Sequence, residues 1–518
     1  RDGLVPMDDD DDDDDASSEG SEEGDDGEGG DDEEESEEEE PAEENKNQLH
    51  GDVERAHQMP MSVNGKPVNP VVPDHKWPVS IRNEDGNFED IMHPGDDTQI
   101  MSVPRFWSDP VHANKLMSRT LAMSIGSCIK ADRKGNHAVG DDCPKNDRTI
   151  FVAIASYRDW QCRYTVESIF TRATYPERVR VGVVDQIVAD EDFSCESSIN
   201  PCSDDPEQAL CKHRDLIDVF QMDAIYAVGP VFARHVGHRM YRGEYYTMQS
   251  DAHVTFTKGW DVDIINQQES IGNDMAVQST YLTDIVGSID ERTGLSKRNT
   301  RPIMCNTDYE GGVQGKHLRH GSQPERHPSI YGMPQLQPYW AAGFSFSRGH
   351  FVVNVPYDQY QPMIFQGEEM SIGLRGFTIG YDYYATEKSV CFHHYAEGPN
   401  AAKRRKVKSF WEHADKYAGT GKKAMTRLLG IVGMNPEVDP STWDHSEEDR
   451  YGCGKVRTTQ KFYDTFGIDV VHKRTEHNLC EFVQTGIMHN DFMKFLRKDG
   501  MGIDYNKISY RFKNPMKN

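Results

Sequence analysis

The amino-acid sequence lacks three features that would each point to a class of protein. It contains no run of about 18 apolar residues, the length that a membrane-spanning helix needs. No region carries a sustained excess of lysine and arginine, which argues against a nucleic-acid-binding domain. Ten cysteines in 518 residues are too few for a disulfide scaffold at this length. We therefore expect no membrane span in this stretch of chain and no nucleic acid as a partner.

Negative charge is what the sequence has in excess, and it is concentrated at one end. The formal net charge is −30, and residues 1–44 hold 26 acidic side chains against one basic side chain. The remaining 474 residues carry 61 acidic and 56 basic side chains, so that part is nearly neutral. Residues 1–60 have little apolar surface to bury and their like charges repel, which predicts a disordered acidic tail that serves as a spacer.

Length and composition suggest how the chain is divided. Its 518 residues suffice for two or three domains, or for one large domain with a tail. Because the chain begins with Arg1 and not with methionine, we expect a fragment or a processed form, and a lost upstream signal or anchor stays open. The predicted segments are the acidic tail (1–60), a proline-rich lead-in with one helix at 112–128 (61–147), the main α/β domain (148–435) and a C-terminal extension without a recognisable motif (436–518).

A strand–helix–strand pattern opens the main domain. Residues 150–155 form a short apolar run, residues 166–170 have helical spacing, and residues 179–184 form a second apolar run. This βαβ unit predicts an α/β fold. Ligands of such sheets bind beyond the carboxyl ends of the strands, and the residues found there are Ser156, Tyr157 and Arg158 after the first strand and Asp185 after the second.

The tripeptide Asp251-Ala252-His253 follows another β-rich run at 245–250. A carboxylate and an imidazole that project to one side of a strand end could bind one divalent cation, and with phosphate oxygens they suit Mn²⁺ or Mg²⁺. The alternative for the tripeptide alone is an ordinary surface turn. Its position after a strand favours the metal site, because a cation at this edge of a sheet would neutralise a pyrophosphate.

A second group of residues could border a bulky ligand. The segment Trp340-Ala341-Ala342-Gly343 contains small residues that let the backbone approach such a ligand closely. Glu368 and Glu369 begin a predicted helix, where the helix dipole favours acidic residues whether or not they act in catalysis.

His393 and His394 follow a predicted strand near the end of the main domain. Either imidazole could complete a metal site that Asp251 and His253 begin. The alternative is a pair of histidines satisfied by hydrogen bonds.

Two further clusters have an ordinary explanation beside a functional one. Cys195, Cys202 and Cys211 could hold zinc with His213, but the tight Cys-x-x-Cys pairs of structural zinc sites are missing, and disulfides or free thiols are the alternatives. The basic run at 403–408 could meet phosphates or act as a nuclear-localisation patch, and a solvated helix face is the default interpretation.

Taken in order, these motifs resemble a known family. The order comprises a strand ending Ala-Ser-Tyr-Arg-Asp, a strand ending in an acid, Gln-Ser-Asp-Ala-His, Trp-Ala-Ala-Gly-Phe, Gly-Glu-Glu and a closing histidine. It is similar to that of GT-A-type nucleotide-sugar glycosyltransferases. It most specifically resembles the polypeptide α-N-acetylglucosaminyltransferases that modify hydroxyproline on the adaptor subunit of SCF ubiquitin ligases. It also resembles the mucin-type polypeptide N-acetylgalactosaminyltransferases, and the resemblance covers residues 148–420.

The resemblance implies a fold and an activity. The fold would be a GT-A fold, a Rossmann-like mixed sheet flanked by helices. The activity would be a metal-dependent, retaining transfer of N-acetylglucosamine from UDP-GlcNAc to a protein hydroxyl, hydroxyproline in the nearest likeness. The alternatives are an enzyme of the same fold that uses another UDP-sugar or a glycan or lipid acceptor, and an inactive nucleotide-sugar-binding protein. The sequence does not identify the sugar, because a few contacts to its hydroxyls and N-acetyl group decide it.

The resemblance also implies roles for individual residues. The metal ligands would be Asp251, His253 and His394 (or His393), a choice left open because the stretch after Cys391 is shorter than in the mucin-type enzymes. The residues close to the UDP-sugar would be Ser156, Tyr157, Arg158, Asp185, Arg234 and Gly343. The residues bordering the sugar and the acceptor, expected to be catalytic, would be Trp340, Glu368 and Glu369.

The compartment is also inferred from the resemblance. The hydroxyproline-modifying enzymes imply a cytoplasmic location. If an N-terminal anchor has been lost, the acidic run would instead be the stem of an enzyme in the Golgi lumen.

Overall fold

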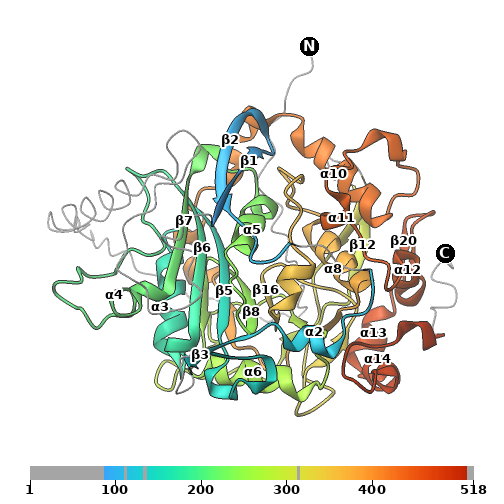
Figure 1. The fold of residues 1–518 in the computed structure, drawn as a ribbon, viewed down its shortest axis with the longest axis horizontal. Coiled ribbons are helices and arrows are strands. Elements are labelled where there is room, and N and C mark those ends of the chain that lie inside the picture. Colours follow the sequence, from blue (N-terminus) through green and yellow to red (C-terminus); the bar gives the residue numbers. More distant parts are fainter. Residues whose placement is uncertain (1–86, 110–113, 132–136, 312–315, 510–518) are drawn as a thin grey trace, which may run out of the picture.

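A mixed eight-stranded sheet lies at the centre of the computed structural model, which describes residues 87–109, 114–131, 137–311 and 316–509 (Figure 1). The predicted acidic tail lies outside the described residues. The strand order is β15-β17-β10-β16-β8-β5-β6-β7. These strands are β5 (Ile150–Tyr157), β6 (Val179–Ile187), β7 (Ile217–Asp223), β8 (Tyr246–Asp251), β10 (Ala276–Ser279), β15 (Gln335–Gln337), β16 (Phe344–Arg348) and β17 (Asp382–Ala385).

The two halves of the sheet differ in strand direction. Strands β8, β5, β6 and β7 are parallel neighbours, with Ile150 of β5 opposite Val179 of β6. Strand β16 runs antiparallel between β8 and β10, and β15 runs antiparallel to β17. Helix α3 (Cys162–Arg172) connects β5 to β6. The predicted βαβ unit and the predicted α/β fold with a mixed sheet flanked by helices are both confirmed.

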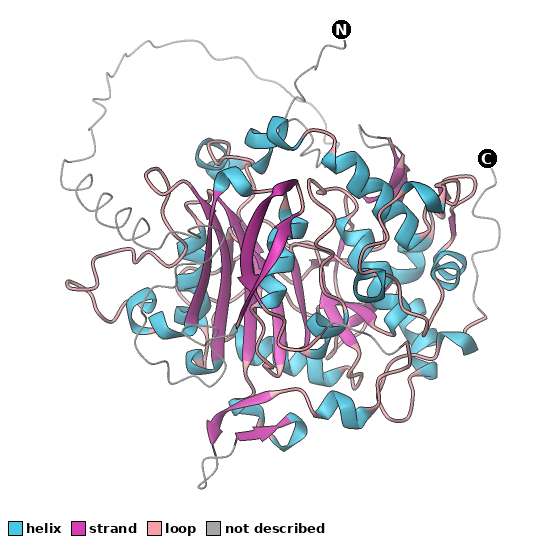
Figure 2. Ribbon diagram, turned by 45° about the horizontal axis from the view of Figure 1, so that its top comes forward, coloured by secondary structure: helices cyan, strands magenta, loops and turns pink. Residues whose placement is uncertain are grey.

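Side chains of alternating residues on β5 enter two different cores. Ile150, Val152 and Ile154 pack with α3 and with α6 (Trp260–Ser270), whereas Phe151 and Ala153 pack with α5 (Pro230–Arg239). Figure 2 shows helices on both sides of the central strands. Because both faces of the strand are covered, the sequence of β5 is a continuous apolar run and does not alternate with polar residues.

The other elements surround this sheet. The further helices are α2 (Arg119–Met123), α4 (Ala209–Lys212), α7 (His350–Asn354), α8 (Glu368–Ile379), α9 (Ala401–Arg404), α10 (Thr420–Val432), α11 (Glu448–Tyr451), α12 (Thr459–Phe466), α13 (Leu479–Gln484) and α14 (Ile487–Phe492). The further strands form two-stranded sheets: β1 (Phe88–His93) with β2 (Asp96–Pro104), β3 (Ser127–Ala131) with β4 (His137–Val139), β9 (Val254–Phe256) with β18 (Cys391–His393), β11 (Arg301–Pro302) with β14 (Glu325–Arg326), β12 (Thr307–Glu310) with β13 (His317–His320), and β19 (Ile468–Asp469) with β20 (Arg474–Thr475). None of the helices in the described part of the chain has the length and apolar character to cross a bilayer.

The C-terminal extension shares a core with the main domain. Phe462, Leu479 and Phe492 are buried together with Phe377 of α8 and with residues of β10 and β17. In Figure 1, helices α12 to α14 lie on the side of the molecule where α8 lies. The C-terminal helices therefore contribute to packing around the sheet.

One helix boundary differs from the sequence-based expectation. The helix predicted at 112–128 is found only as α2, because Ser118 caps its start and Cys128 already belongs to β3. The helix predicted to begin at Glu368 is found as α8, which continues to Ile379 and ends at Gly380 with a φ of 118°. A positive φ favours glycine, so Gly380 separates the helix from β17.

The expectation that ten cysteines are too few for a disulfide scaffold is wrong, whereas the disulfide alternative for the candidate zinc cluster is confirmed. Eight of the ten cysteines form disulfides: Cys128–Cys143, Cys162–Cys195, Cys202–Cys211 and Cys305–Cys480. All three cysteines of the candidate zinc cluster are therefore engaged in disulfides. Partners up to 175 residues apart in the chain are brought together only by the tertiary fold, so the number of cysteines does not predict their pairing.

Candidate functional site

Local strand pairing brings together the residues of the predicted metal site. Asp251 is the last residue of β8, and β9 begins three residues later at Val254. Strand β18 pairs antiparallel with β9 and places His393 opposite Val254. His393 therefore lies beside His253, although 140 residues separate them in the sequence.

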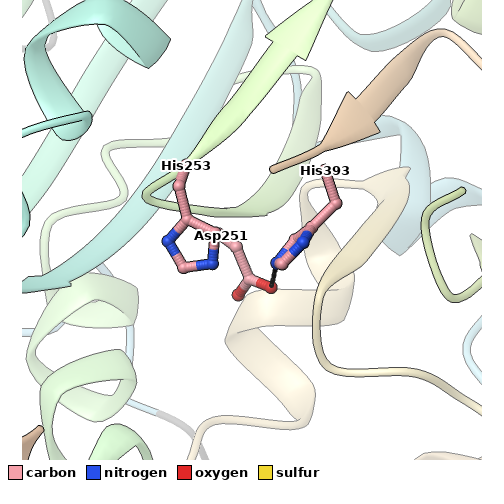
Figure 3. Close-up of side chains that lie close together, drawn as sticks. All are labelled: Asp251, His253 and His393. Carbon is pink, nitrogen blue, oxygen red and sulfur yellow. Dashed lines mark ion pairs between the residues drawn. The ribbon is translucent and has the colours of Figure 1, made fainter. Parts of the chain in front are cut away.

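Asp251, His253 and His393 form a cluster of metal-ligand type (Figure 3). One ligand atom from each lies within 4.8 Å of the others, and His393 Nε2 is 3.6 Å from Asp251 Oδ2. Burial is the main cause that lowers the pKa of His393 well below its ordinary value, so its imidazole is neutral and can donate a lone pair. One carboxylate oxygen and two imidazole nitrogens are a donor set that suits Mn²⁺.

The structure selects one of the two candidate histidines. His394 Nε2 lies 2.8 Å from the hydroxyl of Thr255, outside the cluster. The backbone N–H of His394 donates to the carbonyl of His253 at 3.0 Å, which fixes the register of this segment. The third member of the cluster is therefore His393, one of the two histidines between which the sequence left the choice open.

The carboxylate of Asp159 contacts the Nδ1 atom of His253. That Nδ1 atom lies 2.7 Å from Oδ2 of Asp159, which is in the turn after β5. Arg404 of α9 donates to both oxygens of Asp159 at 2.9 and 2.8 Å. Burial raises the pKa of Asp159, but hydrogen bonds and charges from His253 and Arg404 outweigh it and lower the pKa to about 2. Asp159 is thus an anion at neutral pH.

Close backbone approach positions the carboxylate of Asp251. The N–H of Asp251 donates to the carbonyl of Gly343 at 3.2 Å. A Cβ atom at Gly343 would lie 2.9 Å from Asp251 Oδ2. Gly343, the small residue predicted to admit a ligand, therefore leaves room for the carboxylate of Asp251.

Arg234 of α5 links Asp251 to the start of α8. It donates to Asp251 Oδ1 at 2.7 Å and forms a second ion pair with Glu368. Glu368 also accepts from the hydroxyl of Tyr357 at 2.7 Å, and that hydroxyl lies 3.0 Å from Gln249 Oε1. Arg234 and Glu368 therefore lie beside Asp251, and the roles predicted for them at the donor and the acceptor stay predictions.

Glu369 lies next to this network with different partners. It accepts from the backbone N–H of Ala342 and from the hydroxyl of Tyr281, both at 2.8 Å. Burial raises the pKa of Glu369 to about 7. It lies close to the Ala342-Gly343 segment, where the sequence placed the sugar and the acceptor.

The residues predicted to line the uridine pocket lie at the end of β5. The hydroxyl of Ser156 is buried and has no hydrogen-bond partner among the described residues. The Tyr157 hydroxyl donates to Glu412 at 2.5 Å. Arg158, with a φ of 48°, pairs with Asp192 at 2.7 Å, with Glu412 at 3.0 Å and with Glu191. Their nucleotide-binding role stays a prediction.

Two predicted site residues are fully enclosed. Asp185 is 0% exposed and accepts from the N–H of Cys195 at 2.8 Å, and burial raises its pKa to about 7. The Trp340 ring is 1% exposed in the core near Tyr357. Direct contact of either side chain with a ligand would require rearrangement, so both roles stay predictions.

Sequence reasoning missed Asp159 and Arg404. Asp159 follows Arg158 directly at the strand end, and that position was the available signal. Arg404 lay within the basic run, whose members Lys403, Arg405 and Lys406 are exposed as the default interpretation expects. Arg404 differs, because its side chain is only 10% exposed and contacts Asp159.

A cluster of metal-ligand type and several charged side chains lie together at the carboxyl edge of the parallel strands of this α/β sheet. In α/β proteins this edge is where ligands bind. A sequence model of the family "Glycosyltransferase (GlcNAc)" matches residues 149–209 and 189–472, more than half of the chain. The chain belongs to this family of glycosyltransferases. The comparison with curated proteins gave no significant match.

Solved structures with a similar fold are distant. GalNAc-T7 with UDP, GalNAc and Mn²⁺ is 14% identical with a TM-score of 0.37, and the match covers 64% of this chain and 58% of GalNAc-T7. Residues 1–349 of TarS from S. aureus in complex with UDP-GlcNAc are 13% identical with a TM-score of 0.29, and the match covers 57% of this chain and 77% of TarS. The chain therefore spans less than two thirds of the GalNAc-T7 chain that it matches.

Proposed function

We propose that this protein transfers N-acetylglucosamine from UDP-GlcNAc to a protein hydroxyl, in a metal-dependent reaction that retains the anomeric configuration. The observation that carries the proposal is the Asp251, His253 and His393 cluster at the edge of the sheet in a chain of the GlcNAc glycosyltransferase family. The donor is inferred from that family, and hydroxyproline as acceptor is inferred from the order of the sequence motifs.

The three residues of the cluster would hold a divalent cation. Such a cation would neutralise the diphosphate of the donor and make UDP a better leaving group. Arg234 donates to the Asp251 oxygen other than the one that faces His393, so Asp251 can keep Oδ2 toward the two imidazoles. The ion pair between Arg234 and Glu368 in turn holds the guanidinium in place.

The acceptor step in this proposal needs no protein base. The acceptor hydroxyl attacks the anomeric carbon from the side on which UDP departs, and its proton passes to the departing phosphate. The two glutamates predicted to border the sugar and the acceptor are already engaged, since Glu368 pairs with Arg234 and Glu369 accepts from Ala342 and Tyr281. In this proposal Glu368 and Glu369 would orient the sugar and the residues that surround it.

A donor and acceptor screen tests the proposal. The purified protein is incubated with Mn²⁺ and with UDP-GlcNAc, UDP-GalNAc or UDP-glucose, and with peptides that differ only in hydroxyproline, proline, serine or threonine. Mass spectrometry should find a HexNAc addition with UDP-GlcNAc that EDTA abolishes. Transfer only to glycan or lipid acceptors would overturn the protein-acceptor proposal, and binding of UDP without any transfer or hydrolysis would identify a binding protein.

A pair of neighbouring variants tests the metal site. His393→Ala should reduce Mn²⁺-dependent transfer by at least about 100-fold, because one of three ligands is lost. His394→Ala is the matched control, since its imidazole bonds Thr255 outside the cluster, and it should retain most of the activity. The reverse order of the two effects would contradict the assignment of His393.

We also propose that the folded protein resides in an oxidising compartment. Four disulfides join eight of its ten cysteines, and such pairs persist in secretory compartments but are rare in the cytosol. This supports the luminal alternative over the expected cytoplasmic location, with an acceptor in the same compartment. Thiol titration of the natural protein under denaturation should find two free thiols, those of Cys391 and Cys453, whereas ten would support a reducing compartment.

A further inference from the structure

The carboxylate of Asp159 faces one nitrogen of a proposed metal ligand. Its Oδ2 is 2.7 Å from His253 Nδ1, and Asp159 is 5% exposed. A neutral imidazole carries one proton, so a proton on Nδ1 donated to this carboxylate leaves the lone pair on Nε2. Asp159 thus favours the tautomer of His253 that can bind a cation with Nε2.

Arg404 and the backbone hold Asp159 in this orientation. Arg404 Nη1 donates to both carboxylate oxygens, at 2.9 and 2.8 Å, and to Gln161 Oε1 at 2.8 Å. The N–H of Gln161 donates to Asp159 Oδ1 at 2.9 Å. Oδ1 is therefore anchored to the turn before α3, while Oδ2 remains directed at His253.

Arg404 is the one member of the 403–406 run that turns inward. Its side chain is 10% exposed, whereas its neighbours Lys403 and Arg405 are exposed. It lies eleven residues after His393 on the same stretch of chain. The stretch of chain from His393 to Arg404 thus supplies two groups. His393 is the third residue of the cluster, and Arg404 pairs with Asp159, the carboxylate that contacts His253.

We propose that Asp159, clamped by Arg404, is a positioning residue that fixes the orientation and tautomer of His253 for metal binding. This inference rests on the proposed function, because it presumes that His253 binds the cation. Outer-shell carboxylates that accept from a metal-binding histidine contribute about 10- to 100-fold to metal affinity. The role differs from a purely structural one, in which Asp159 would serve only the turn before α3.

The decisive variant is Asp159→Asn, measured by calorimetric titration of Mn²⁺ into the full chain saturated with UDP. An asparagine can keep the bond from Gln161 and can present an N–H group toward His253, which favours the tautomer with its proton on Nε2. Mn²⁺ affinity should fall by about 10- to 100-fold, while the affinity for UDP without metal stays unchanged.

A second variant keeps the test decisive if Asp159→Asn does not fold. Arg404→Gln removes the clamp and leaves the carboxylate of Asp159 facing His253, so Mn²⁺ affinity should fall by a smaller factor of about 3 to 10. Arg405→Gln, an exposed neighbour, is the control and should bind Mn²⁺ as the unmodified protein does. When Arg404→Gln is added to Asp159→Asn, it should cause little further loss of Mn²⁺ affinity, since the carboxylate that Arg404 positions is already gone.

Three results would test separately the proposed function, the positioning role of Asp159 and the role of Arg404 as its clamp. Failure of the unmodified protein to bind Mn²⁺ in the presence of UDP would contradict the proposed function itself. If the unmodified protein binds Mn²⁺ and a folded Asp159→Asn variant binds it equally well, the positioning role is overturned while the proposed function stands. A lower melting temperature with unchanged Mn²⁺ affinity in Arg404→Gln would assign Arg404 to the stability of the turn and overturn its role as a clamp.

Discussion

At the scale of single residues, the site depends on how little space surrounds Asp251. Its carboxylate receives Arg234 on one oxygen and lies near His393 with the other. Gly343 leaves room for it, since a Cβ atom there would come within 2.9 Å of Oδ2. A carboxylate so confined has few alternative rotamers, which favours a preorganised metal ligand.

Gly343→Ala should therefore reduce metal-dependent transfer. The added methyl group displaces the Asp251 carboxylate, and a misplacement of this size costs about 10- to 100-fold in rate. Steady-state kinetics at several Mn²⁺ concentrations would detect the loss. Gly311→Ala is the control, because a Cβ atom at Gly311 meets nothing within 4 Å. Unchanged kinetics for Gly343→Ala would show that Asp251 tolerates the displacement.

Asp185 predicts a pH dependence of stability. Burial raises its pKa from 3.8 to about 7 in the folded protein. Between these pH values the folded state holds a proton on Asp185 that the unfolded state has released, so the contribution of Asp185 to the free energy of unfolding should fall as pH rises from 4 to 7 and then level off. The contribution is at most about 4 kcal/mol.

Asp185→Asn should remove this slope. Urea unfolding at pH 5 and pH 8 would compare the variant with the unmodified protein, and the variant should gain stability mainly at pH 8. Asp97→Asn, at an exposed position, is the control and should leave the pH profile as it is. An equal pH profile in Asp185→Asn would show that Asp185 does not titrate in this range.

At the scale of elements, a buried ion pair ties α6 to the turn between α3 and β6. Asp261, in the first turn of α6, accepts from Arg178 at 2.6 Å and from the N–H of Thr174 at 2.7 Å. Asp261 is 0% and Arg178 1% exposed. An acidic side chain in the first turn of a helix is favoured by the helix dipole, and Asp261 has a long-range partner in addition.

Asp261→Asn should destabilise the protein by about 3–5 kcal/mol, because it leaves the charge of Arg178 buried without a partner. Chemical denaturation followed by fluorescence would measure the loss. Asp263→Asn lies in the same helical turn but at an exposed position, and it should change stability by less than about 0.5 kcal/mol. Equal effects of the two variants would contradict a specific role for the buried pair.

At the scale of the whole molecule, Cys305–Cys480 connects the C-terminal helices to the region before β12. It closes a loop of 175 residues, whereas Cys202–Cys211 closes one of 9. The entropy that a cross-link removes from the unfolded chain grows with loop length, to about 5 kcal/mol for the longer loop and about 2.5 kcal/mol for the shorter one. Cys305–Cys480 should therefore stabilise the protein more than Cys202–Cys211 does, and it also links the C-terminal extension to the main domain.

Replacing both Cys305 and Cys480 with serine should lower the melting temperature more than replacing Cys202 and Cys211. Differential scanning calorimetry would rank the two double variants. Cys453→Ser removes a free thiol and serves as the control, with little change expected. The opposite ranking would show that local packing, and not loop length, decides the contribution of each disulfide.

The strands near the site could be read from local patterns. β5 and β6 bury both faces, and their sequences contain continuous apolar stretches. The strand before Asp251 is also buried, although Thr247, Gln249 and Ser250 are polar. Polar residues at the ends of these strands then predict the ligand edge of the sheet. The Asp251-Ala252-His253 half of the cluster follows from sequence for this reason.

The other half required the tertiary structure. His393 and His394 are adjacent, and successive residues of an extended chain point to opposite sides, so the register of β18 on β9 decides which imidazole meets Asp251. The clamp of Arg404 on Asp159 joins residues 245 positions apart. No local pattern distinguishes Arg404 from the exposed basic residues around it.

The amino-acid sequence by itself determined the acidic balance of the tail, the βαβ unit and the Asp-x-His element, because charge and hydrophobic periodicity act between residues close in the chain. Only the tertiary structure decided the pairing of cysteines, the burial of Trp340 and Asp185, and the choice of His393. These depend on contacts between segments far apart in the chain, which sheet register and core packing bring together.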